Sequence, residues 1–531
     1  MRWKVLRRWP LKPCVQVKFK PLALLAAVIA APVVAEPAFR PVTVPEHIYT
    51  GGWEHFVGGG VAVLDCDQDG YPDLYVAGGE TPALLLRNAT AEAGELAFSA
   101  VPANAAAVTG VTGAYPLDID SDGFADLAVL RVGENLLLQG GPECRFTPFD
   151  NLGFQDVSAW TTAFSATWEG GAKLPTLAFG NYVNRDDPDG PFEACDVNYL
   201  YRPEGEVYGA PIPLSPGLCP LSMLFSDWSR SGRADLRFSN DRHYYVTGGQ
   251  EQLLKMAESP RFYTADEGWR EHKLWGMGIA SRDLTGDGLP DVMMTSMGDQ
   301  RLQFQDGSGQ KPAFSDAPYD LGATAQRPFT GGDGRPSTGW HVQFGDVQND
   351  GLDDIFIAKG NVEQMPGLAM KDPNNLLVQD ADGSFTETAE AAGVASLHRG
   401  RGGALVDLDR DGLLDLVVVN RRAPLEVYRN VTPDAGRWTS LRLAQTGVNK
   451  NAVGAWLEVT ADDRHYSREI TVGGGHAGGQ LGPEHFGLGE ASAFLVRVIW
   501  PDGVTSDWTT LASDTAYVIR ADGTRLAVAP E

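Results

Sequence analysis

Acidic side chains at a fixed spacing recur along this chain. The clearest copy runs from Asp407 to Asp415, with aspartates at loop positions 1, 3, 5 and 9 and Gly412 at position 6. Calcium takes six to eight oxygen ligands, and short carboxylates on alternate residues of a tight turn can converge on one cation. Gly412 suits the sharp bend because glycine tolerates positive φ. The spacing therefore predicts a calcium-binding loop.

The loop occurs in five good copies, and a sixth copy at Asp227 is degenerate because serines replace the carboxylates at positions 3 and 5. We predict one Ca²⁺ in each good loop, about five in all, held by the side chains at positions 1, 3, 5 and 9 and by the carbonyl at position 7. The predicted ligands are Asp65, Asp67, Asp69, Tyr71, Asp73, Asp118, Asp120, Asp122, Phe124, Asp126, Asp283, Thr285, Asp287, Leu289, Asp291, Asp346, Gln348, Asp350, Leu352, Asp354, Asp407, Asp409, Asp411, Leu413 and Asp415.

Two other interpretations of these loops are weaker. An EF-hand needs a bidentate glutamate at loop position 12 and a helix after it. Position 12 is apolar in all five loops, as at Val76 and Val418, and it lies within a strand-like run. A plain hydrophilic turn does not require four crowded carboxylates, which repel one another without a cation. The loops are therefore expected to join strands to strands and to bind metal.

The repeat also predicts the architecture. Successive loops begin 53, 109, 56, 63 and 61 residues apart, so the 109-residue step is expected to hold one further unit without a loop, with strands near 163–167 and 174–182. Each unit contains four short strands separated by turn residues, which is typical of a propeller blade. We predict an all-β chain in which residues 36–436 form a seven-bladed β-propeller.

The two ends of the repeat region are expected to meet. The last unit lacks a fourth strand, and residues 38–44 have the composition of the missing one. Pairing of residues 38–44 with the strand near 425–429 would close the ring and remove an open sheet edge. Residues 437–531 are predicted to form a separate, small β-sandwich-like domain, with strands at 438–443, 455–459 and 494–500.

The N-terminus predicts export. Residues 1–20 carry seven basic residues and no acidic one, and an apolar run of fifteen residues ends at Ala35. Residues 1–35 are therefore predicted to be a signal peptide, and the mature protein to be secreted or periplasmic. A membrane anchor is the alternative, although a span needs ~20 apolar residues. Cleavage would change the formal charge from −26 to −33, which argues against nucleic acid or anionic membranes as partners.

Few residues outside the loops carry a signal for chemistry. Four cysteines follow residue 35, and Cys195 with Cys219 is the preferred disulfide, while Cys66 and Cys144 either pair or stay free. A glycine-rich segment at 473–478 has the dinucleotide-binding spacing, but more glycines and a proline follow where a helix must begin. We expect a flexible turn there. The sequence contains no P-loop, zincin or nucleophile-elbow motif, and no catalytic residue is assigned.

These features resemble a known family. The Asp-x-Asp-x-Asp-Gly-x-x-Asp units are similar to FG-GAP or VCBS repeats, the calcium-binding blades also found in the integrin α-subunit head. The tail resembles the ASPIC/UnbV domain at residues 451–455, 468–470, 485–489 and 500–503. Together, the repeats and the tail resemble the cartilage-acidic-protein-like family. That resemblance implies a role in extracellular interaction or adhesion.

The expected function is a non-enzymatic one. We expect an exported, calcium-binding propeller that binds a protein or a glycan outside the cytoplasm. The alternative is a periplasmic hydrolase or oxidoreductase whose active site lies in the central funnel of the propeller. A cluster of histidines or carboxylates at one end of the inner strands, outside the aspartate loops, would favour the enzyme.

Overall fold

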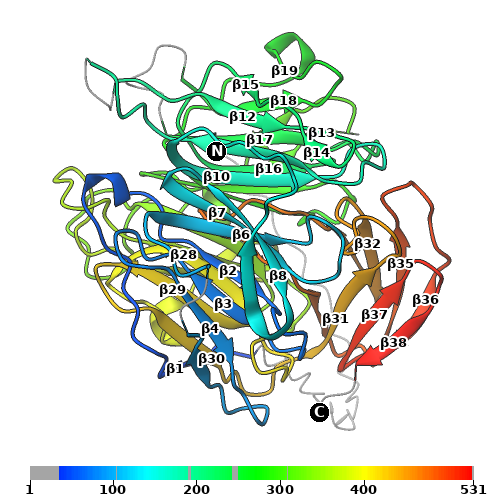
Figure 1. Cartoon of the computed structure of the whole chain (residues 1–531). Coiled ribbons are helices and arrows are strands. Elements are labelled where there is room, and N and C mark those ends of the chain that lie inside the picture. The colour runs from blue at the N-terminus through cyan, green and yellow to red at the C-terminus, as the bar shows by residue number, and fades with distance from the viewer. Residues whose placement is uncertain (1–34, 103–104, 189–192, 242–248, 308, 529–531) are drawn as a thin grey trace, which may run out of the picture. The chain divides into compact units, whose positions relative to one another are not determined.

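The computed structural model describes residues 35–102, 105–188, 193–241, 249–307 and 309–528, and this part of the chain is almost entirely β-structure (Figure 1). Its α-helix is the single turn α1 (Ala389–Ala392), and four 3-10 turns occur, namely η1 (Trp53–His55), η2 (Pro142–Cys144), η3 (Ala265–Glu267) and η4 (Tyr319–Leu321). The predicted signal peptide lies outside the described residues except for Ala35. None of the described helices is long and apolar enough to cross a membrane.

Residues 39–430 form successive antiparallel runs of four strands. In chain order, the first three runs are β2 (Val61–Leu64), β3 (Asp73–Val76), β4 (Leu84–Asn88) and β5 (Phe98–Ala100); β6 (Val111–Leu117), β7 (Asp126–Gly133), β8 (Leu136–Gly141) and β9 (Arg145–Pro148); and β10 (Ala159–Thr167), β11 (Thr176–Asn181), β12 (Asn198–Tyr201) and β15 (Ile212–Leu214). The second and third runs are joined into one eight-stranded sheet because β7 also pairs with β10. A small hairpin, β13 (Pro203–Glu204) and β14 (Val207–Tyr208), precedes β15.

The remaining runs follow the same order of strands. They are β16 (Pro220–Ser226), β17 (Asp235–Asn240), β18 (Gln252–Lys255) and β19 (Arg261–Phe262); β20 (Gly276–Arg282), β21 (Asp291–Ser296), β22 (Arg301–Gln305) and β23 (Phe314–Asp316); β24 (Gly339–Gly345), β25 (Asp354–Lys359), β26 (Asn375–Gln379) and β27 (Phe385–Glu387); and β28 (Arg399–Val406), β29 (Asp415–Arg421) and β30 (Glu426–Asn430), completed by β1 (Phe39–Val42). The unit expected without a loop is present, since β10 and β11 pair where strands were predicted.

The runs close into a ring. Their first strands contact one another in chain order, and β28 contacts β2. The N-terminal strand β1 pairs with β30, from Phe39 opposite Asn430 to Val42 opposite Val427 (Figure 1). The predicted pairing of residues 38–44 is therefore confirmed. An otherwise open sheet edge is covered by the other end of the same ring.

Apolar side chains hold neighbouring runs together. Between the runs that begin with β20 and β24, Met293 and Leu302 share a core with Phe344, Ile355 and Leu377. Each of these side chains is buried, and burying a residue of this size contributes about 1.5–3 kcal/mol. The first strands are buried on both faces, because alternate residues pack into different cores: in β16, Met223 and Phe225 belong to one core and Leu224 to another. All nine residues of β10 are buried.

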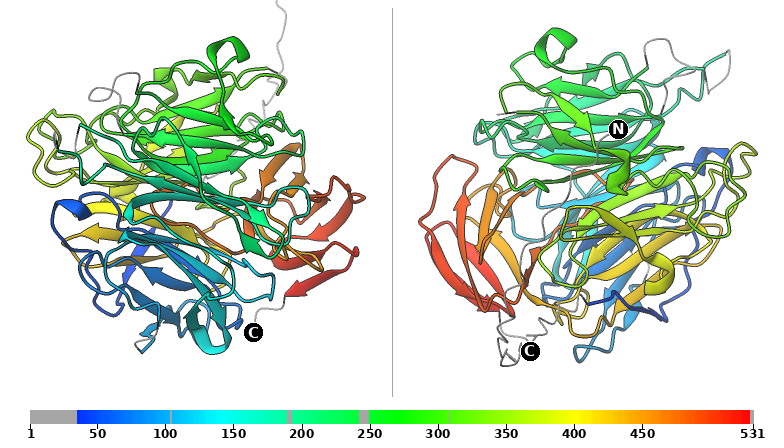
Figure 2. Two further views of the ribbon diagram at one scale, coloured as in Figure 1. Left: turned by 45° about the horizontal axis from the view of Figure 1, so that its top comes forward. Right: turned by 180° about the vertical axis from the view of Figure 1, so that it is seen from behind.

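Residues 437–528 form two four-stranded sheets around one further core. One sheet contains β31 (Arg437–Ala444), β34 (Glu484–Gly489), β37 (Thr515–Arg520) and β38 (Arg525–Val528), and the other contains β32 (Trp456–Ala461), β33 (Arg464–Glu469), β35 (Ala493–Ile499) and β36 (Thr509–Ala512). Figure 2 shows these strands in orange and red as a group of their own. Leu441, Leu457, Phe486 and Phe494 come from both sheets and pack together.

The glycine-rich segment between β33 and β34 runs through the centre of the ring. We call residues 472–480 the central segment. It forms β-bridges with the first strands of five runs, joining Val472 to Ala166, Gly473 to Leu224, Gly475 to Ile279, Gly478 to Ala114 and Gln480 to Val63. Gln480 also donates to Gln343 Oε1 (2.9 Å) in β24 and to the Leu405 carbonyl (3.1 Å) in β28. The expectation of a flexible turn was therefore wrong, because its backbone groups are bonded inside the ring.

Close backbone approach explains the glycines on both sides of this contact. A Cβ atom at Gly60 or Gly113 would lie 1.7 or 1.8 Å from the Ala477 carbonyl oxygen. A Cβ atom at Gly478 would lie 2.2 Å from the Val61 carbonyl oxygen. Such distances are far below van der Waals contact, so a side chain at any of these positions must displace backbone.

Substitution of Gly478 tests the central segment. We expect Gly478→Ala to lower the melting temperature, because the added methyl overpacks a rigid site, which typically costs about 1–3 kcal/mol. Gly482→Ala is the matched control, since no atom lies within 4 Å of its Cβ position. Equal melting temperatures for the two variants in thermal unfolding would contradict the tight packing of residues 472–480.

Candidate cation-binding loops

Each of the five good loops joins the first strand of a run to the second. The aspartate at position 9 is the first residue of that second strand, as Asp73 is in β3 and Asp415 is in β29. The loops therefore connect strand to strand, as the apolar position 12 predicted. In the degenerate copy, Asp235 begins β17 in the same way.

The structure brings predicted ligands together in three loops. Among the described residues, trios of carboxylate oxygens lie within 4.8 Å of one another, and they come from Asp65, Asp67 and Asp73; from Asp118, Asp120 and Asp122; and from Asp407, Asp409 and Asp415. The loops at Asp283 and Asp346 carry Thr285 and Gln348 at position 3, so they hold one carboxylate fewer. In the described part of the chain, neither of these two loops brings three carboxylate oxygens within that distance.

Hydrogen bonds within each loop hold the aspartates in place. In the last loop, the Gly412 amide donates to Asp407 Oδ2 (3.0 Å) and the Leu413 amide donates to Asp411 Oδ1 (2.9 Å). The equivalent two bonds occur in the other four loops. They require a tight turn, and Gly412 adopts a φ of 89°. Glycine takes this left-handed conformation without a Cβ clash.

Some of these buried oxygens have no protein partner. Asp65 Oδ1 and Asp118 Oδ1 accept no hydrogen bond and are shielded from solvent. An unsatisfied buried carboxylate oxygen is costly, and a bound cation would satisfy it. Carboxylate and carbonyl oxygens are the ligands that calcium prefers. The donor set at these loops therefore fits a hard divalent cation.

The position-9 aspartates have a structural role that the repeat spacing did not reveal. Asp126 Oδ2 accepts from the amide of Ile119 (2.7 Å) at loop position 2, and its Oδ1 accepts from Gly140 (2.8 Å) in the third strand. The same pair of bonds forms at Asp73, Asp291, Asp354 and Asp415. Each carboxylate therefore fastens the loop to the third strand, whether or not it also binds a cation.

Arginine side chains contact the position-3 carboxylates of two loops. Arg429 Nε lies 2.6 Å from Asp409 Oδ2 and its Nη2 lies 2.5 Å from Asp411 Oδ2. Arg87 Nε lies 2.5 Å from Asp67 Oδ2. The equivalent residue at the loop of Asp118 is Gln139, whose amide donates to Asp120 Oδ2 (2.7 Å). The repeated Arg-Asn pair that ends β4 and β30 was the sequence signal for these arginines.

The degenerate loop is filled by protein contacts. Both oxygens of Asp227 accept loop amides, from Ser231 (2.9 Å) and Gly232 (2.6 Å). Glu469 of β33 accepts from the Asp227 amide (2.8 Å), and Arg230 pairs with Glu458 of β32 at 2.6 Å. The C-terminal sheets therefore dock where the repeat has lost two carboxylates.

Burial and mutual repulsion shift the acidity of the loops. Burial raises the pKa of Asp73 to about 7, of Asp126 to about 8 and of Asp291 to about 7. Burial, followed by repulsion from Asp122, raises the pKa of Asp118 to about 6. Carboxyls of this kind favour the neutral form until a cation compensates their charge.

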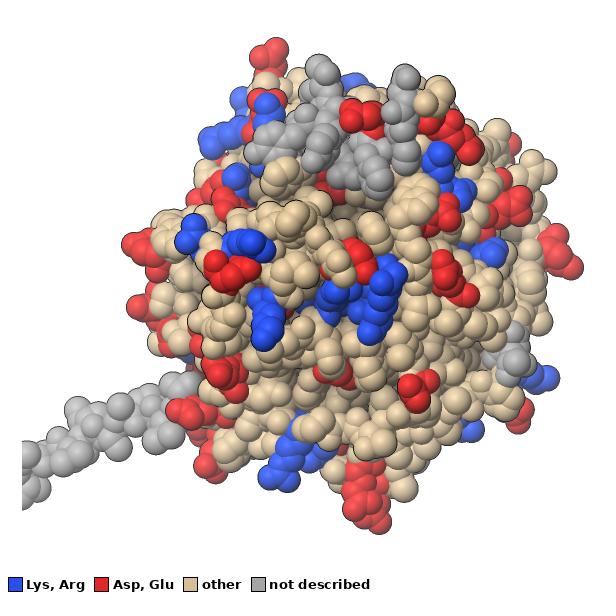
Figure 3. Space-filling model, turned by 90° about the vertical axis from the view of Figure 1, so that its left-hand side faces the viewer, with Lys and Arg blue, Asp and Glu red and all other residues tan. Residues whose placement is uncertain are grey.

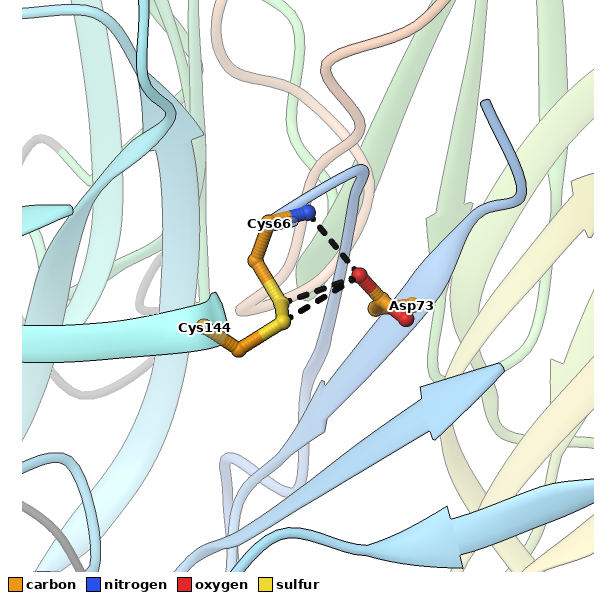
Figure 4. A group of neighbouring side chains, drawn as sticks. All are labelled: Cys66, Asp73 and Cys144. Carbon is orange, nitrogen blue, oxygen red and sulfur yellow. Dashed lines mark hydrogen bonds between the residues drawn. A yellow bond between two sulfur atoms is a disulfide. The ribbon is translucent and has the colours of Figure 1, made fainter. Parts of the chain in front are cut away.

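Two disulfides are formed, the preferred one and the one that the sequence left open. Cys195 pairs with Cys219, and Cys66 pairs with Cys144. Figure 4 shows Asp73 beside both sulfurs of the second pair, with the Cys66 amide donating to Asp73 Oδ2 at 2.9 Å. Disulfide sulfurs carry no proton and are not thiolate ligands, so this group is a crosslink at the base of the first loop.

The raised pKa values of these carboxyls predict how stability depends on pH. In metal-free protein we expect the melting temperature to fall as pH rises from about 6.5 to about 8.5, because folded carboxyls with raised pKa must ionise there while the unfolded ones already have. Below that window, the buried residues His341, His476 and His485 have the opposite effect. Burial lowers their pKa values, so stability rises with pH while the unfolded histidines lose their protons. Thermal unfolding at several pH values measures the slope, and a rise across this window would contradict the assigned burial.

Comparisons with known proteins agree with the sequence resemblance. The FG-GAP-like repeat model matches residues 65–129 and 283–357, and the ASPIC and UnbV model matches residues 445–525. Cartilage acidic protein 1 is 24% identical over 477 residues in both mouse and human, covering 84% of this chain and 70% and 69% of those proteins. The crystal structure of BBS1N in complex with ARL6DN, soaked with lead, is 11% identical, with a TM-score of 0.41 over 75% of this chain and 99% of that one. The chain thus carries FG-GAP-like repeats and an ASPIC and UnbV domain, and it is similar to cartilage acidic protein 1.

Proposed function

We propose that this chain is an exported, calcium-stabilised, seven-bladed β-propeller with a β-sandwich-like C-terminal domain, and that it binds a protein or a glycan outside the cytoplasm. The observation that carries the calcium proposal is the convergence of carboxylates in the aspartate loops, with buried oxygens at Asp65 and Asp118 that have no protein partner. Calcium fits better than magnesium, because magnesium prefers a tighter octahedron and keeps its waters.

The proposed role in interaction is supported by the similarity to cartilage acidic protein 1. The acidic character of the chain supports partners other than nucleic acid. On the face shown in Figure 3, acidic side chains are spread over the surface and basic ones gather only in small groups. A polyanion would therefore find no extended basic track on that face.

The enzymatic alternative is less well supported. The central segment occupies the middle of the ring, where the funnel active site was placed, and it is bonded to the surrounding strands. A cavity of about 640 Å³ adjoins this segment and is lined by Asp65, Asp283, Arg282, Arg468 and His341 among others. Substrate turnover that is lost on mutation of His341 would favour the enzyme over the interaction module.

Removal of one loop ligand tests the calcium sites. We expect Asp120→Asn to lose one bound calcium, because position 3 of that loop is a direct ligand and no arginine contacts it. Asp150→Asn is the control, since Asp150 is an exposed aspartate outside the loops. Titration calorimetry counts the sites, and thermal unfolding should show that chelation lowers the melting temperature and that calcium restores it better than magnesium. The proposal fails if chelation changes nothing and elemental analysis finds no metal.

Removal of an internal cation tests the electrostatics of the loops. We expect Arg429→Gln to strengthen calcium binding at the loop of Asp407, because the guanidinium that contacts Asp409 and Asp411 competes with the ion. Arg40→Gln is the matched control, because Arg40 lies opposite Arg429 in the β1–β30 ladder and is exposed. Weaker calcium binding in Arg429→Gln would show that the arginine orders the loop instead of competing.

A further inference from the structure

Side chains at loop position 4 link one aspartate loop to the next around the ring. Gln68 Nε2 donates to the Gly123 carbonyl (2.9 Å), and Asn349 Nδ2 donates to the Gly412 carbonyl (2.9 Å). In both cases the acceptor is the position-6 glycine of the following loop. Gly123 and Gly412 directly precede Phe124 and Leu413, whose carbonyls are the predicted position-7 ligands.

The same arrangement recurs between the last loop and the first. The guanidinium of Arg410, at position 4, lies 5.2 Å from the centre of the Tyr71 ring. A Cβ atom at Gly70 would lie 3.2 Å from Arg410 Nη1, so Arg410 packs against the position-6 glycine of the first loop. In the degenerate copy, Arg230 Nη1 donates to the Gly288 carbonyl (3.1 Å) of the next loop.

Where a position-4 side chain does not reach the next loop, residues of the C-terminal domain make the contact to the loop instead. Position 4 of the loop at Asp283 is Gly286, which has no side chain to reach the next loop. There, Tyr466 of β33 donates to the Gly351 carbonyl (3.2 Å). At the other end, Ser121 Oγ accepts from the Asn449 amide (2.9 Å), which belongs to the segment between β31 and β32. The loops at 346, 407, 65 and 118 thus form a connected series, which we call the loop belt.

The backbone at position 4 makes these links sensitive to loop closure. Gln68, Asn349 and Arg410 have φ values of 64°, 59° and 60°. Residues other than glycine adopt this region only when their surroundings enforce it. A cation that draws positions 1, 3 and 5 together fixes position 4 between them. The position-4 side chain is then held against the next loop, beside that loop's own ligand.

We propose that the position-4 side chains are positioning residues that make cation binding cooperative along the loop belt and that couple it to docking of the C-terminal sheets. This inference rests on the proposed calcium binding. Filling one loop orders the donor that holds the next loop's position-6 carbonyl, so the next cation meets a loop with less conformational freedom left to lose. Coupling of this kind is reciprocal between the two sites.

Calcium titration of the full chain with a Gln68→Ala variant tests the coupling. Gln68 is exposed, so losing its bond to Gly123 should lower the metal-free melting temperature only slightly. We expect the slope of the calcium isotherm to fall, and the affinity of the loop at Asp118 to drop roughly two- to tenfold, as for the loss of one hydrogen bond. Ser99→Ala, on the exposed outer strand of the same run, is the control and should match the wild type.

Two further variants separate coupling from charge. Gln68→Glu keeps the size of the side chain, loses the donor and adds a negative charge, so it should raise overall affinity and still lower the slope. In an Asp120→Asn background, Gln68→Ala should lower the slope no further, because the second partner is already disabled. A slope and affinity in Gln68→Ala equal to those of the wild type would overturn the coupling and leave calcium binding intact. A wild-type titration that shows no calcium binding would overturn both proposals.

Discussion

Enclosure of aspartate carboxylates at the junction between the first and second strands, which occurs in every run except the one that begins with β10, is the constraint on which the ring depends. The position-9 carboxylate accepts one amide from the loop and one from the third strand, so three segments of every such run meet at one side chain. Those bonds satisfy buried backbone amides that would otherwise be costly. Burial of these carboxylates also raises the pKa of Asp73, Asp126 and Asp291. The fold and the proposed cation sites thus depend on the same residues.

The repeat spacing was sufficient to predict most of the fold. Glycine and aspartate at fixed positions marked the turn between the first and second strands in every run except the one that begins with β10, and apolar residues after position 9 marked the second strand itself. The unit without a loop was found because its strands kept their apolar pattern at 163–167 and 174–182. The pairing of β1 with β30 followed from a unit with one strand too few. Each of these signals comes from residues that are close together in the sequence, or from counting the strands in one unit.

The rest depended on contacts between distant residues. Residues 472–480 have the composition of a flexible turn, and only the neighbouring glycines at 60 and 113 show that backbone must approach there. Those glycines lie more than three hundred residues away in sequence, and each has another local explanation. Arg87, Arg429 and Gln68 likewise look like solvated surface residues until the facing loop is placed. Spacing identified the acidic side chains of the loops, and tertiary structure was needed to identify the residues that pair with them and connect one loop to the next.

The central segment also has a consequence for how the chain reaches this state. His476 contacts Gly58 across 418 positions of sequence, and β1 joins β30 across almost the whole ring. Contacts of such high sequence separation form slowly, because a long loop must close before any of them contributes. During synthesis, the first strands of the ring exist well before residues 472–480 are made. Until the segment arrives, the amides and carbonyls at the inner edge of the first strands have only water as a partner. The centre of the ring is therefore hydrated in early forms and loses its water last.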